Sequence, residues 1–143
     1  MSSILHDLQI NASPEKVFEG ISSPSLLDEW WTKNSKGVPA INEIYELYFS
    51  PEYVWKGKVT KYISPNEFEL EIFDSHPDWD NTKVGFHISG ENNNTKLSFY
   101  HSDWKQANEH FRISSYCWAS YLRILKGYLE KGIRVPYEER DIV

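Results

Sequence analysis

The sequence predicts an α+β fold in which short antiparallel strands are followed by one long helix that crosses the sheet. Six segments before residue 102 alternate apolar and polar residues, whereas residues 108–132 have a helical hydrophobic period. A helix of about 23 residues is about 35 Å long, comparable to the width of six strands spaced about 4.8 Å apart. One helix could therefore span the concave face of a curved sheet, and large side chains or a ligand cavity would fill the gap.

The N-terminal part reads as one strand followed by two short helices. In residues 4–11, Ile4, Leu8 and Ile10 share one side, as in a half-buried strand. Ser13-Pro14-Glu15 then supplies an N-cap hydroxyl, a proline at the first helical position and an acid near the helix N-terminus. A similar helix-start pattern, a serine followed by proline, recurs at Ser23-Pro24-Ser25. We expect the second helix to run to the Trp30-Trp31 pair.

Beyond Pro39 the hydrophobic period is two, which predicts a meander of antiparallel strands. Glu67, Glu69 and Glu71 alternate with apolar residues and are expected to face water. The inward faces expected for the second to sixth strands are Tyr45, Leu47 and Phe49; Trp55, Gly57 and Val59; Phe68, Leu70 and Ile72; Val84, Phe86 and Ile88; and Leu97, Phe99 and His101.

The final helix is predicted from Asn108 to Gly132. Glycine at its end favours a left-handed C-terminal cap, and Pro136 lies just beyond. Gly127, inside the helix, costs about 1 kcal/mol relative to alanine unless a neighbour packs closely against it. The apolar stripe that should face the sheet comprises Phe111, Ser115, Trp118, Leu122, Leu125 and Leu129.

Composition predicts one domain over residues 1–143. A net charge of −6 argues against a nucleic-acid partner, which requires a concentrated basic surface. The lone Cys117 excludes an intramolecular disulfide, and the N-terminus does not resemble a signal peptide, so we expect a cytoplasmic protein. No apolar run approaches the roughly 20 residues of a transmembrane helix.

Four segments together resemble a known family. They are residues 11–18 (NASPEKVF), 27–31 (LDEWW), 97–104 (LSFYHSDW) and 117–132 (CWASYLRILKGYLEKG). In order and spacing they resemble the helix-grip fold of the START-like (SRPBCC, birch-pollen-allergen-like) superfamily, and within it the family of activator of heat-shock-protein-90 ATPase homologues. The resemblance implies a curved, antiparallel six-stranded sheet with two short helices and a long C-terminal helix across its concave face.

The resemblance implies a fold more securely than an activity. The superfamily includes lipid carriers, hormone receptors, cyclases and co-chaperone domains on one frame. The chain also departs from the family pattern, because Asp103 and Cys117 stand where a glycine usually precedes the tryptophan. These side chains lie near the ends of the expected cavity, so ligand size does not carry over from the family.

The sequence contains no recognised catalytic motif or phosphate-binding loop, and no cofactor is expected. Histidines 6, 76, 87, 101 and 110 lack a metal-ligand spacing such as His-x-x-x-His. His101 faces inward by strand parity, where it could contact a ligand, act as an acid–base group, or be a hydrogen-bonded core histidine. In the acidic loop 74–81, Trp79 is interpreted as an anchor rather than a partner contact.

The main functional hypothesis is non-enzymatic binding of a small hydrophobic or amphipathic molecule between the sheet and the last helix. Two alternatives remain: a co-chaperone-like domain with a protein partner such as a chaperone, and an enzyme of the polyketide cyclase or aromatase kind that uses His101. The aromatic side chains expected to line a cavity could instead fill it. The candidate ligand-binding residues are Trp30, Trp31, Trp55, Phe86, Phe99, His101, Trp118 and Tyr121.

Overall fold

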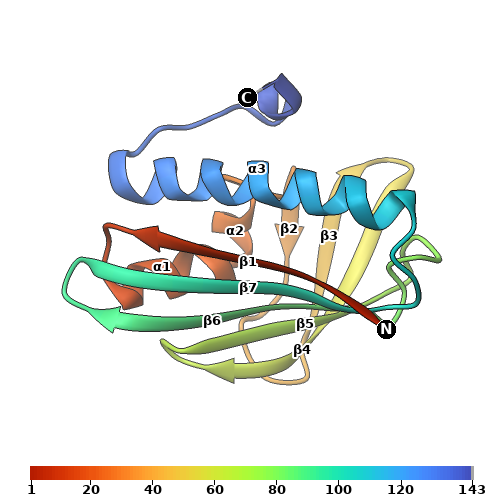
Figure 1. Cartoon of the computed structure of the whole chain (residues 1–143), viewed down its shortest axis with the longest axis horizontal. Helices are drawn as coiled ribbons and strands as arrows, with labels where there is room; N and C mark the ends of the chain where they lie inside the picture. Colours follow the sequence, from red (N-terminus) through yellow and green to blue (C-terminus); the bar gives the residue numbers. More distant parts are fainter. Residues whose placement is uncertain (143) are drawn as a thin grey trace.

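The computed structural model describes residues 1–142 and shows one antiparallel sheet with a long helix packed against it (Figure 1). The sheet has seven strands, whereas the sequence predicted six. The elements are β1 (Ser2–Ile10), α1 (Pro14–Ser22), α2 (Pro24–Leu27), β2 (Asn34–Lys36), β3 (Ile44–Ser50), β4 (Tyr53–Ile63), β5 (Glu67–Phe73), β6 (Lys83–Glu91), β7 (Asn94–Trp104), α3 (Glu109–Lys131) and a 3₁₀ segment (Tyr137–Ile142).

The strand order is β1-β7-β6-β5-β4-β3-β2, and every neighbouring pair is antiparallel. From β2 to β7 the strands follow one another as a meander, and β1 then pairs with β7. The first strand, β1, is therefore an edge strand, and the last strand, β7, is its only neighbour in the sheet. This brings the N-terminal strand beside the strand that leads into α3 (Figure 1).

The strand missed by the sequence prediction is β2. It has three residues, Asn34, Ser35 and Lys36, and pairs with residues 46–48 of β3. A run this short and polar carries no period-two hydrophobic signal. Its strand geometry comes from pairing with β3, which the local sequence does not encode.

The second helix is shorter than predicted. α1 begins as expected, because Ser13 Oγ accepts a hydrogen bond from the backbone N–H of Lys16 at 3.2 Å. α2 ends at Leu27, so Trp30 and Trp31 lie in the turn that follows rather than in the helix. Ser23, its N-cap residue, makes no side-chain capping bond, which is consistent with a single helical turn.

The long helix α3 has the predicted ends. Asn108 Oδ1 accepts from the backbone N–H of Phe111 at 2.9 Å, and Gly132 adopts a left-handed conformation with φ of 67°. Beyond Gly132 the chain turns back and runs beside α3 (Figure 1). Arg140 fastens this tail, because its guanidinium donates to the backbone carbonyls of Asp28 and Thr32 in the turn after α2.

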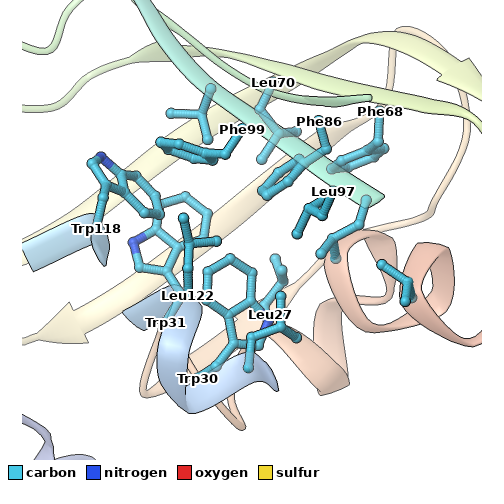
Figure 2. Close-up of a cluster of buried hydrophobic side chains, with 14 of the residues drawn as sticks. Leu27, Trp30, Trp31, Phe68, Leu70, Phe86, Leu97, Phe99, Trp118 and Leu122 are labelled. Carbon is cyan, nitrogen blue, oxygen red and sulfur yellow. The ribbon is translucent and has the colours of Figure 1, made fainter. Parts of the chain in front are cut away.

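Much of the gap between α3 and the sheet is packed with side chains (Figure 2). Trp30 is fully buried, meets Phe86 edge-on with ring centroids 6.1 Å apart, and donates from Nε1 to the carbonyl of Gly20 at 3.0 Å. Phe99 lies 4.6 Å from Trp118 of α3 by ring centroid. The Trp30 region is therefore a close-packed core that joins the turn after α2, the sheet and α3.

Glu69 is buried, contrary to the prediction that all three glutamates of β5 face water. The residue beside it on β6 is Gly85, and a Cβ there would lie 2.1 Å from the Tyr100 ring. The absence of a side chain at Gly85 lets Tyr100 reach across β6 from β7 and donate its hydroxyl hydrogen bond to Glu69. Thr60 Oγ1 donates to the other carboxylate oxygen at 2.8 Å, so the buried charge is hydrogen-bonded on both sides.

Candidate functional site

An open pocket of about 470 Å³ lies at the N-terminal end of α3. One wall is α3, and the others are the β3–β4 hairpin, the loop between β5 and β6, and Trp31 from the turn after α2. Helix residues at spacings of three and four turn one face toward the pocket. The lining residues are Trp31, Phe49, Tyr53, Trp55, His76, Asp78, Trp79, His110, Ile113, Ser114, Cys117, Trp118 and Tyr121.

The eight candidate residues separate into two sets of four. Those that line the pocket are Trp31, Trp55, Trp118 and Tyr121. Those that lie in the packed interior, away from the pocket lining, are Trp30, Phe86, Phe99 and His101. The space between the sheet and α3 is therefore filled at one end and open at the other, and ligand binding by the pocket set stays a prediction.

Aromatic rings in contact form the inner wall of the pocket. The centroid of Trp31 lies 5.0 Å from that of Trp118, and Trp55 lies 4.9 Å from Trp79. Trp79 and Trp118 stack with an interplanar angle of 22°. Ring pairs at these separations fix one another's orientation, so the wall presents a preformed apolar surface. Trp79 is 7% exposed, which fits the interpretation of this residue as the anchor of its loop.

His101 is a hydrogen-bonded core residue in this structure. Trp118 Nε1 donates to His101 Nδ1 at 3.0 Å, and an indole N–H can only donate, so Nδ1 carries no proton. The proton is therefore on Nε2, which donates to Thr82 Oγ1 at 2.8 Å. The Thr82 hydroxyl in turn donates to the carbonyl of Trp79 at 2.5 Å. Both ring nitrogens are occupied, and His101 has no contact with the pocket space.

Burial sets the protonation of this region. It lowers the pKa of His101 to about 3, with the charge of nearby His110 acting in the same direction, so the imidazole is neutral at pH 7. Burial also raises the pKa of Tyr121 to about 12 and raises the pKa of the Cys117 thiol. Both pocket residues are therefore protonated at neutral pH, and Cys117 is a weak nucleophile.

The polar side of the pocket mouth consists of His76, Asp78 and His110. His110 Nδ1 lies 2.9 Å from Asp78 Oδ2, and the rings of His76 and His110 meet edge-on with centroids 4.6 Å apart. Spacing along the sequence did not predict this cluster, because its residues come from a loop and from a helix more than 30 residues later. The available signal was weaker: a His-x-Asp pair in one loop, and a histidine in the first turn of the helix that the loop faces.

Comparison with known protein families shows which family the chain belongs to. The sequence profile of the family described as Activator of Hsp90 ATPase homolog 1-like protein matches residues 11–130. The chain belongs to this family. Family membership confirms the resemblance that the four sequence segments indicated, and the Activator of Hsp90 ATPase homolog 1-like fold accounts for the sheet and the long C-terminal helix. A search of curated proteins found no match.

Solved structures share this Activator of Hsp90 ATPase homolog 1-like architecture. An Aha1 dimer from Colwellia psychrerythraea is 28% identical and has a TM-score of 0.83, over 92% of this chain and 98% of that one. Protein MLL2253 from Mesorhizobium loti is 18% identical, with a TM-score of 0.82 over 92% and 99% of the two chains. CalU16 from Micromonospora echinospora is 16% identical, with a TM-score of 0.72 over 96% and 82%. The last two show the fold alone.

None of the helices within residues 1–142 has both the length and the apolar character needed to cross a membrane.

Proposed function

We propose that this domain binds a small hydrophobic or amphipathic molecule, without transforming it, in the pocket at the N-terminal end of α3. The observation that carries the proposal is the pocket itself. Its volume of about 470 Å³ falls within the roughly 300–1,000 Å³ typical of small-molecule sites. Its wall is mostly aromatic, and its carboxylate and two imidazoles lie together at the mouth. This arrangement suits a ligand with an apolar body and one polar end.

The residues of the wall favour binding over catalysis. Tyr121 and Cys117 hold their protons at neutral pH, and His101 is hydrogen-bonded inside the core. An acid–base role for His101, as in a cyclase or aromatase, would require contact with a ligand that this position does not offer. The free thiol Cys117 is compatible with a reducing compartment, and we propose a cytoplasmic site of action.

Tryptophan fluorescence can report binding in the pocket. Four of the six tryptophans line it, so a ligand that enters should change the intrinsic fluorescence. We expect saturable binding of the amphipathic aromatic dye 1-anilinonaphthalene-8-sulfonate by the folded protein, and native mass spectrometry of the freshly purified protein should detect a co-purified ligand. Trp55→Ala removes one wall, and Cys117→Phe fills part of the space.

Both pocket variants should weaken dye binding at least about tenfold, which corresponds to about 1.4 kcal/mol. Trp55→Ala removes apolar contact with the dye, and the Cys117→Phe ring occupies space that the dye would take. Tyr116→Ala is the matched control, because Tyr116 is 77% exposed on α3 and does not line this pocket. Dye binding that is unchanged in both pocket variants, or equally weak in the control, would refute the proposal.

A protein-interaction role is the second candidate, and family membership together with exposed apolar residues on α3 favours it. Ile113 is 52% exposed and Tyr116 is 77% exposed, one helical turn apart. Exposed apolar neighbours are typical of contact surfaces. If the chain acts on an Hsp90 chaperone, it should increase the ATPase rate of Hsp90, and Ile113→Ser with Tyr116→Ser should reduce that increase. An unchanged ATPase rate with and without the wild-type chain would exclude this role.

A further inference from the structure

Three potential metal ligands converge at the pocket mouth from two separate parts of the chain. His76 and Asp78 come from the loop between β5 and β6, and His110 comes from the first turn of α3. One ligand atom from each residue lies within 4.8 Å of those from the other two. His110 Nδ1 lies 2.9 Å and His76 Nδ1 lies 3.8 Å from Asp78 Oδ2. All three side chains border the pocket and are partly accessible.

These separations are close to those of a metal site. With metal–ligand bonds of about 2.0–2.2 Å, neighbouring ligand atoms in octahedral or tetrahedral geometry lie about 2.8–3.6 Å apart. The 2.9 Å distance already matches, and the 3.8 Å distance needs a side-chain shift of less than about 1 Å. His76 lies in a loop and its side chain is 45% exposed, so the shift would disturb mainly its edge-on contact with His110 and its hydrogen bond from the Asp78 backbone.

Hydrogen bonds already hold the three groups together. The backbone N–H of Asp78 donates to His76 Nδ1 at 3.0 Å, so that nitrogen carries no proton, and an ion bound there would replace this hydrogen bond. The Asp78 carboxylate accepts from His110 Nδ1 at 2.9 Å. Asn108 Nδ2 also reaches this carboxylate, at 3.4 Å. The His110 proton that lies between the ring and the carboxylate is the one an ion would displace.

We propose that His76, Asp78 and His110 bind one divalent transition-metal ion of the zinc class at the mouth of the pocket. Two imidazoles and one carboxylate suit borderline ions, whereas Mg²⁺ and Ca²⁺ prefer sites made of oxygen alone. Three protein ligands leave at least one coordination position open, which is typical of sites that accept water or a ligand. Because the three residues border the pocket, the bound ion would lie at its mouth.

Cobalt(II) provides the direct test, since its visible absorption bands report ligand number and geometry. The full-length protein, stripped of metal with EDTA and dialysed, should bind one Co²⁺ per chain, and Zn²⁺ should displace it while Mg²⁺ should not. His76→Ala and His110→Ala should each weaken Co²⁺ binding by about a hundredfold. His87→Ala is the matched control, because His87 is exposed on β6 and contributes nothing to the cluster.

Circular dichroism of each variant establishes that the fold is intact before the titration. The proposal is overturned if the wild type shows no saturable one-to-one binding, or if His110→Ala binds Co²⁺ as tightly as the His87→Ala control. The inference does not depend on the pocket's apolar ligand, because the dye titration is performed in EDTA and the metal titration without dye. Either proposal can therefore fail while the other stands.

Discussion

Replacing His101 with glutamine should remove a specific part of the pH dependence of stability. The folded imidazole is neutral, with a pKa of about 3, whereas an unfolded histidine has a pKa of about 6.5. Between these values the unfolded chain binds one more proton than the folded chain, so acidification favours unfolding. The contribution is fully present above pH 6.5 and falls by about 1.4 kcal/mol per pH unit as the pH drops below that. From pH 7.5 to 4.5 the loss is about 3 kcal/mol.

Glutamine can accept from Trp118 and donate to Thr82, as the histidine does, but it does not titrate. At pH 7.5 we expect His101→Gln to lower the free energy of unfolding by about 1–3 kcal/mol, because the amide cannot match the ring geometry at both partners. By pH 4.5 the difference between variant and wild type should shrink or reverse, since the wild type has lost its histidine contribution.

Urea unfolding followed by tryptophan fluorescence, repeated from pH 7.5 to 4.5, measures both slopes. His87→Gln, at an exposed position, should keep the wild-type slope. A nitrogen-15 spectrum should show one His101 ring locked in the Nε2–H tautomer down to pH 5. If His101→Gln retained the wild-type slope, or the ring protonated near pH 6.5, the reasoning from burial and hydrogen bonding would be wrong.

Two glycine substitutions should act in opposite directions, both measured by thermal and urea unfolding. Gly85→Ala forces the Tyr100 ring out of its place and leaves buried Glu69 without that hydrogen bond, so the protein should lose about 1–3 kcal/mol; Tyr100→Phe, which removes only the hydroxyl, should lose less. A neutral Gly85→Ala would contradict this packing. Gly127→Ala should gain about 0.5–1 kcal/mol, because a Cβ at that helical position meets nothing within 4 Å. A loss of stability there would refute the assignment of open space.

Local sequence predicted those parts of the fold that depend on neighbouring residues. The ends of α3 could be read from Asn108 and Gly132 because a cap is formed within one turn of the helix. β2 could not be predicted from the sequence, because its three polar residues form a strand only by pairing with β3. Glu69 was misplaced for a similar reason: the side chain that covers it, Tyr100, is 31 residues away.

The candidate site was predicted in part for a related reason. Strand and helix periodicity correctly placed the side chains that face inward, but periodicity does not show where the gap between α3 and the sheet is filled. Filling depends on how Trp30 from a turn, Phe86 from β6 and Trp118 from α3 meet in space. The metal cluster likewise joins residues 76–78 to His110 across two elements. Contacts at this sequence distance are properties of the assembled fold.

The division of the interior into a filled end and an open end also bears on how members of such a family can diverge. Trp30 and Phe86 hold the packed end, while Tyr53 and Ile113 border the open one and are about half exposed. Substitutions at these last two positions can change the size and shape of the pocket with little disturbance to the packing that keeps α3 on the sheet. Such substitutions can therefore accumulate during evolution and change the size and shape of the pocket without compensating changes in the packed core.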